Sequence, residues 1–156
     1  MSQPPLVAEL FAAFALEVGA TPSVTLRGGN ALDDYRSPPP FESATDSISD
    51  SYLESYPWGI GYLDAVSWRH YLPYLIEYAI RHKHSGNLVV DGLLNSLRPP
   101  DREPARLASL SPQQEALVVL FLELLAFGEP TPHQALACQV LDEWWIPNAI
   151  YRPASQ

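Results

Sequence analysis

Carboxylate side chains gather in one stretch of the chain, between residues 33 and 64. This stretch holds seven acids and a single base, Arg36. The acids are Asp33, Asp34, Glu42, Asp46, Asp50, Glu54 and Asp64. Three of them, Asp46, Asp50 and Glu54, recur every four residues, a spacing that puts side chains on one face of a helix. Like charges at this spacing cost a few tenths of a kcal/mol, so the face serves either solubility or the docking of a basic partner.

Aromatic side chains are interleaved with these acids, and tyrosine and tryptophan are enriched at protein interfaces. They are Tyr35, Phe41, Tyr52, Tyr56 and Trp58. Most of these side chains are equally suited to a buried core. We therefore expect a partner-binding surface in which Tyr35 and Trp58 are the aromatic anchors beside the acids Asp46, Asp50 and Glu54.

A second aromatic group lies around Pro73. Its members are Trp68, Tyr71, Tyr74 and Tyr78, with Arg69 and His70 between them. Aromatic walls with a few convergent polar groups are typical of small-molecule pockets. The alternative to a docking surface is therefore a ligand-binding protein or enzyme with a pocket at this proline, in which the arginine and the histidine make the polar contacts.

The other reactive side chains predict no catalytic site and no metal site. Cys138 lies among apolar residues of a predicted helix, where nothing activates its thiol. His82 and His84 are about 200° apart on a helix, whereas shared metal ligation favours spacings of three or four residues. Cations at this position suit a helix C-terminus instead. We therefore expect no catalytic residue, no metal and no cofactor.

Apolar periodicity places the first helix close to the N-terminus. Leu6, Leu10 and Phe14 repeat every four residues, which predicts an amphipathic helix of about 13 residues that docks by its apolar stripe. This helix is expected to end at Gly19.

Residues 19–45 show no sustained hydrophobic period. They contain Gly28-Gly29 and a run of three prolines that begins at Pro38. Glycine and proline mark turns and loops, and the two glycines lack the flanking strand and helix of a phosphate-binding loop. We expect a long loop, with at most a short extended piece over residues 23–27.

The acidic helix is predicted to begin at Ser47, with Asp50 in the third helical position of a capping pattern. Pro57 ends it. Residues 63–84 are the most apolar and aromatic part of the chain. Because proline disrupts a helix interior, we expect two helices here that meet at a kink, with Pro73 in the first turn of the second.

Three later helix starts carry residue types that cap helices. Asn87 precedes a leucine-rich segment, and asparagine is a favoured N-cap. Ser111 and Thr131 are each followed by proline and then, two residues later, by glutamine, the pattern of a capping box. The predicted helices cover residues 88–97, 112–127 and 132–145.

Composition bounds the class of protein. A chain of 156 residues suits one domain, and 47% hydrophobic with 17% charged residues indicates a buried core. The net charge of −9 argues against a nucleic-acid partner or an anionic membrane surface. No apolar run reaches the length of a membrane span, the first apolar stretch lacks the basic start of a signal peptide, and a single cysteine forms no internal disulfide. We expect a cytoplasmic protein.

One segment carries a family resemblance. Residues 68–75, with Tyr71-Leu72-Pro73 at their centre, are similar to a helix in a family of small uncharacterised bacterial proteins, a domain of unknown function. Residues 107–114, which open a later helix, fit the same family. The likeness spans roughly residues 47–147. It implies one α-helical domain, and because the family has no established activity it implies no catalytic residue.

Together these patterns predict an all-α fold, a compact bundle of six to seven helices with a long Pro/Gly-rich loop after the first. We expect a single domain over residues 1–156, with residues 147–156 as a C-terminal tail. The expected function is that of a non-enzymatic acidic interaction protein, of the immunity, inhibitor or adaptor type, that binds a basic protein. Its oligomeric state is left open.

Overall fold

The computed structural model describes residues 3–153, and this part of the chain contains helices and no strand. The prediction of an all-α fold is therefore confirmed. The α-helices are α1 (Gln3–Ala13), α2 (Ala15–Gly19), α3 (Leu26–Asp33), α4 (Asp50–Ser55), α5 (Ala65–Arg81), α6 (Leu88–Ser96), α7 (Ala105–Ala108), α8 (Pro112–Phe127) and α9 (Gln134–Val140). A 3₁₀-helix, η1 (Pro57–Tyr62), and a π-helical turn, η2 (Leu141–Trp145), complete the set.

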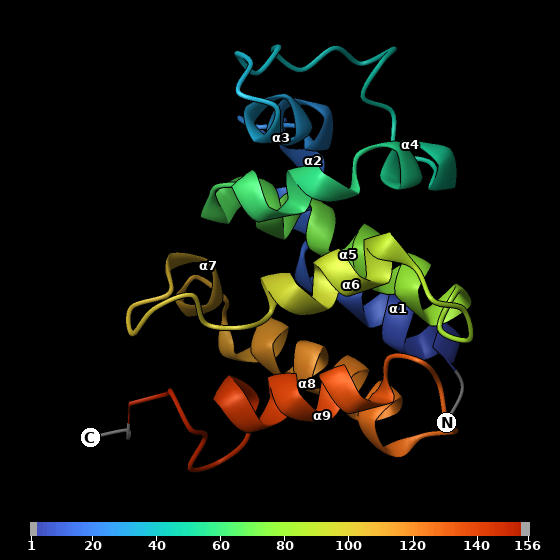
Figure 1. Cartoon of the computed structure of the whole chain (residues 1–156), viewed down its shortest axis with the longest axis vertical. Coiled ribbons are helices and arrows are strands. Elements are labelled where there is room, and N and C mark those ends of the chain that lie inside the picture. Colours follow the sequence, from blue (N-terminus) through green and yellow to red (C-terminus); the bar gives the residue numbers. More distant parts are fainter. Residues whose placement is uncertain (1–2, 154–156) are drawn as a thin grey trace.

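The helices form three tiers along the long axis of the molecule (Figure 1). The lower tier holds α8 and α9, the middle tier α1, α5 and α6, and the upper tier α3, α4 and η1. Helix α5 contacts α1, α2, α6 and α7, and it supplies more fully buried side chains than any other element. One cluster of buried apolar side chains runs from α1 to η2, so the tiers share a single core.

The predicted loop over residues 19–45 contains a helix, α3, where we expected only a short extended piece. Thr25 caps it, since its Oγ1 accepts a hydrogen bond from the Gly28 backbone at 2.8 Å. Glycine costs about 1 kcal/mol in a helix, but here it lets two backbones touch. A Cβ atom added at Gly29 would lie 2.4 Å from the carbonyl oxygen of Gly59 in η1. Tertiary packing therefore outweighs local propensity.

Helix α5 is continuous across Pro73, which corrects the prediction of two helices. The proline ring removes the backbone donor that would bond to the carbonyl of Arg69, a cost of about 3 kcal/mol. Fully buried side chains lie on both sides of the proline, among them Leu72, Leu75 and Ile76. Burial of each such side chain contributes about 1.5–3 kcal/mol, so the core holds the two halves in one helix.

Two of the predicted caps are confirmed. Asn87 accepts hydrogen bonds from the first turn of α6, and Ser111 forms a complete capping box with Gln114 at the start of α8. Two other starts differ. Ser49, and not Ser47, caps α4. Helix α9 begins after a turn in which the carbonyl of Thr131 accepts a bond from its first residue, so it starts two residues later than predicted.

The chain ends differ from the prediction only in detail. The first helix is divided at Phe14 into α1 and α2, and α2 ends at Gly19 as expected. Of the predicted tail, residues 154–156 lie outside the described part. The preceding residues fold back on the last helix, where the Ile150 and Tyr151 backbones donate to the carbonyls of Asp142 and Glu143 at 2.9 and 3.1 Å.

Candidate functional site

Asp46 lies in a bend four residues before α4 begins, and its carboxylate is buried. Arg27 donates to both of its oxygens at 3.0 and 2.8 Å. The Tyr52 hydroxyl and the Glu42 backbone donate at 2.7 and 2.9 Å. Burial alone would raise the pKa of Asp46, but the hydrogen bonds from Arg27, from Glu42 and from Tyr52 outweigh it and lower the pKa. Asp46 therefore shares no helix face with the other predicted acids.

Asp50 and Glu54 lie in α4, but both bind α5. Asp50 accepts hydrogen bonds from the two Nη atoms of Arg81 at 2.9 and 2.7 Å. These bonds lower the pKa of Asp50 to about 2. Glu54 accepts a bond of 2.7 Å from the hydroxyl of Tyr78. The three acids predicted to face a partner thus hold α4 and its preceding bend to the rest of the molecule.

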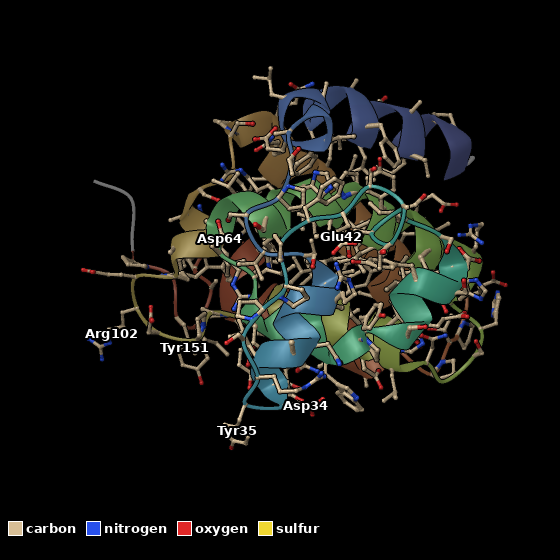
Figure 2. The ribbon with its side chains drawn as sticks, turned by 90° about the horizontal axis from the view of Figure 1, so that it is seen from above. Asp34, Tyr35, Glu42, Asp64, Arg102 and Tyr151 are labelled. Atoms are coloured by element: carbon tan, nitrogen blue, oxygen red, sulfur yellow. The ribbon has the colours of Figure 1, made fainter. Side chains whose placement is uncertain are left out.

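Tyr35 has a different environment, since its side chain is 100% exposed. Its backbone has φ 60°, in the left-handed region that a bulky residue rarely adopts. Figure 2 shows Asp34 and Tyr35 projecting from the end of α3. The neighbouring Asp33 accepts a hydrogen bond of 3.0 Å from the hydroxyl of Tyr62, which raises the pKa of Tyr62. Tyr62 is itself exposed.

We call Asp33, Asp34, Tyr35 and Tyr62 the Tyr35 surface. It joins the end of α3 to the end of η1, two elements that pack tightly on each other. Asp34 forms an exposed ion pair with Arg36 at 3.2 Å. Of these four residues, only Tyr35 was predicted from the sequence to belong to a binding site. The adjacent acids Asp33 and Asp34 could have indicated the rest of the surface. Glu42 and Asp64 are further exposed acids on the side of the molecule seen in Figure 2.

Trp58, the second predicted anchor, is 55% exposed in η1. It lines a surface pocket of about 320 Å³ between η1, α6 and α7. Leu88 lines the same pocket and is also half exposed. Arg106 and Asp91 are the charged residues of the lining.

The aromatic residues predicted to form a pocket at Pro73 fall into two groups. Trp68, Tyr71 and Tyr78 have no exposed surface and fill the core. Trp68 donates its indole hydrogen bond to Ser96 of α6 at 3.1 Å, and the Tyr71 hydroxyl accepts one from the backbone at the start of α3 at 3.3 Å. These three side chains stabilise the contacts of α5 and line no surface pocket.

His70 and Tyr74, by contrast, line a shallow surface pocket of about 420 Å³ beside the segment that follows α2. The Nδ1 atom of His70 lies 2.8 Å from the carbonyl oxygen of Glu17, so this nitrogen carries the proton in the neutral ring. Arg69 is paired with the side chain of the same Glu17 at 3.1 Å. The predicted polar contacts are thus engaged with α2.

Within residues 3–153 the remaining candidate groups make contacts with neighbouring parts of the fold. In that range no three His, Cys, Asp or Glu side chains stand close enough to hold a metal ion. His82 stacks on Tyr78 with ring centroids 4.1 Å apart, and His84 lies 3.1 Å from Glu129. The thiol of Cys138 faces the carbonyl of Ala126 at 3.7 Å. None of the helices in the described part combines the length and apolar character that a membrane crossing needs.

Comparison with known proteins identifies the family and no activity. The model of a family of unknown function, DUF6714, matches the chain over residues 4–149, and the chain belongs to this family. The resemblance to a domain of unknown function is therefore confirmed. No curated protein and no solved structure gives a match.

Proposed function

We propose that this protein is a non-enzymatic interaction protein that binds a basic protein partner through the Tyr35 surface. The observation that carries the proposal is the state of Tyr35, a fully exposed aromatic ring on a left-handed backbone. A bulky residue in that conformation costs about 1–3 kcal/mol. Such strain at an exposed aromatic residue is typical of a binding position, because the ring makes no contribution to the core that would offset it.

The surroundings of Tyr35 favour a cationic partner. Asp33 and Asp34 immediately precede Tyr35 in sequence; Asp34 is exposed and Asp33 is partly exposed. The whole chain carries a net charge of −9. An arginine or lysine of a partner can pair with these carboxylates and stack on the ring of Tyr35. The overall negative charge would also raise the rate of encounter with a basic protein.

The acids proposed to bind a partner, Asp33 and Asp34, differ from those that the sequence spacing predicted. Asp46 is buried, and Asp50 and Glu54 bind helix α5, so a partner would have to break contacts between distant segments to use them. The pair of Asp34 with Arg36 is exposed on both sides and joins residues two apart, so a partner can replace it. Trp58 is separate from the Tyr35 surface in the proposal, because its exposed face lines the pocket with Arg106. An immunity, inhibitor or adaptor protein of the cytoplasm fits such a binding mode, and we propose that class.

The test is capture of partners from the protein's own cell extract at low and moderate salt. The wild-type chain is expected to retain a basic protein that is released as salt rises. Tyr35→Ala and Asp34→Asn should each weaken the purified complex by roughly tenfold, or about 1.4 kcal/mol. Glu123→Gln is the matched control, because Glu123 is an exposed acid on α8 in the lower tier.

The proposal fails if the captured protein binds the Tyr35→Ala variant as tightly as the wild type. It also fails if the loss on Glu123→Gln equals the loss on Asp34→Asn, since the binding would then depend on net charge and not on the Tyr35 surface.

A further inference from the structure

Arg106 lacks the carboxylate partner that most arginines of this protein have. Within residues 3–153 the arginine–acid pairs are Arg27–Asp46, Arg36–Asp34, Arg69–Glu17, Arg81–Asp50, Arg98–Glu143 and Arg152–Glu115. Two arginines of this range, Arg102 and Arg106, form no such pair. Arg102 is exposed to solvent, whereas Arg106 is half buried. A chain with twice as many acids as bases has thus left a partly desolvated cation without an acid.

The guanidinium of Arg106 is only partly used by the fold. It donates to the carbonyl oxygens of Ile60 and Gly61 at 3.3 and 3.4 Å, both long for hydrogen bonds of this type. Burial lowers the pKa of Arg106, and no acid opposes this effect. A guanidinium has five N–H donors in a planar fork. Donors therefore remain for a ligand at the pocket that Arg106 lines.

The pocket beside Arg106 has apolar walls and a small volume. Trp58 and Leu88 line it and are 55% and 54% exposed, which is high for side chains of this size. Its volume is about 320 Å³, near the lower end of the range for ligand pockets. Such a pocket accepts a small apolar group and excludes a dinucleotide or a large cofactor.

We propose that this pocket binds a carboxylate carried on a small apolar or aromatic body, with the carboxylate on Arg106 and the body against Trp58 and Leu88. Arginine matches the planar carboxylate with two parallel hydrogen bonds. A doubly charged phosphate is disfavoured relative to a singly charged carboxylate, because Arg106 is the one cation among the residues that line the pocket and Asp91 lines it as well. The same chemistry is offered by a free organic acid and by the C-terminal residue of a peptide.

This site is formed by η1, α6 and α7 and does not include the Tyr35 surface. The inference therefore stands apart from the proposed function. The Tyr35→Ala variant, which should lose the basic partner, should bind the carboxylate as the wild type does.

The experiment is an NMR titration of the full-length protein, followed at the indole N–H of Trp58 and the Nε–H of Arg106. Phenylacetate represents a free acid and N-acetylphenylalanine a peptide C-terminus, and each is compared with its neutral amide and with inorganic phosphate. We expect saturable shifts of both signals with at least one carboxylate in the millimolar range. The matching amide should bind at least roughly tenfold more weakly. The acid that binds more tightly identifies the source.

Three outcomes would overturn the site: equal shifts with acid and amide, tighter binding of phosphate, or no shift with either acid.

Variants add an independent check. Arg106→Gln removes the charge and Trp58→Ala removes one wall, and both should abolish or strongly weaken binding. Arg102→Gln is the matched control, because that arginine also lacks an acid but lines a neighbouring pocket. Since Arg106 also holds η1, a melting curve of each variant accompanies the titration. Trp58→Ala keeps the site testable if Arg106→Gln unfolds, and retained binding in a folded Trp58→Ala would contradict the proposal.

Discussion

The role of an acidic side chain in this protein depends on what it pairs with, and its spacing along the chain is a poor guide. Asp46 and Asp34 illustrate the difference. Asp46 is buried and accepts four hydrogen bonds from three residues. Asp34 is exposed and has one ion pair, with an arginine that is exposed as well. Of the two carboxylates, only that of Asp34 is accessible to a partner, whereas that of Asp46 stabilises the fold.

We predict that Asp46→Asn lowers the free energy of unfolding at neutral pH by about 2–4 kcal/mol, because Arg27 then keeps a charge without its acid. The pKa of Asp46 is lowered in the folded state from 3.8. The ionised acid thus stabilises the fold above that pH, and this contribution is lost as the pH falls through the folded-state pKa. The difference between wild type and variant should therefore shrink below pH 3.8 in urea unfolding curves measured across pH.

Asp34→Asn is the control for this prediction. An exposed ion pair contributes about 0–1 kcal/mol, so the variant should unfold close to the wild type at every pH. A stability loss at Asp34 as large as that at Asp46 would contradict our account of both residues.

The packing of α3 on η1 positions the whole upper tier. At the crossing, Gly29 meets Gly59, and each glycine lacks the Cβ that would strike the backbone of the other element. Tyr35 follows α3 by two residues, and Tyr62 is the last residue of η1. This contact between two short helices therefore places the proposed partner surface.

Gly29→Ala is expected to lower the free energy of unfolding by about 1–3 kcal/mol, since overpacking forces a backbone shift that outweighs the gain in helix propensity. The added Cβ would lie 2.4 Å from the Gly59 carbonyl oxygen, which has no flexible side chain to move away. The same variant should weaken partner binding, because it displaces the Tyr35 surface. Chemical denaturation and the capture experiment measure the two effects.

Gly61→Ala provides a matched control in η1. No atom lies within 4 Å of a Cβ added at Gly61, so its stability should equal or slightly exceed that of the wild type. If Gly61→Ala and Gly29→Ala were equally destabilising, helix η1 and not the close approach would be the sensitive feature.

The three tiers share one core, and this governs how the molecule unfolds. Trp68 lies in the middle tier and donates a hydrogen bond to α6. Trp145, near the C-terminal end of the chain, donates a hydrogen bond to the carbonyl of Leu97. The same buried cluster includes Leu26 of α3 in the upper tier. No tier can therefore lose its packing without exposing apolar surface of its neighbour.

We predict that the chain unfolds in a single cooperative transition, because all three tiers contribute to one buried cluster. Far-UV circular dichroism and tryptophan fluorescence should give the same urea midpoint. The Trp58→Phe variant sharpens the test, because it removes the half-exposed indole and leaves the three buried ones as reporters. Midpoints that differ between the two probes would indicate that a tier unfolds by itself.

Several features could be predicted because they depend on neighbours in sequence. The Ser111 capping box, the Asn87 cap and the leucine-rich helix that follows it need only side chains within one turn. The apolar stripe of Leu6, Leu10 and Phe14 is likewise a local pattern, and all three side chains are buried. The all-α class could be predicted for the same reason, because the helix periodicities and caps are local patterns.

Other features depend on contacts between residues far apart in sequence, which periodicity does not report. By sequence alone Gly28-Gly29 indicates a loop, but in the fold it lies in a helix that packs against η1. Likewise Pro73 indicates a helix break by sequence, but burial in the core keeps α5 continuous. Asp46 pairs with Arg27 because segments distant in sequence meet in the fold. For the same reason, only the fold shows that Arg106 has no carboxylate partner within residues 3–153. The helix propensities that a local pattern reflects amount to about 1–3 kcal/mol. The free energies of burial and ion pairing are of the same magnitude or larger, so they can override these propensities.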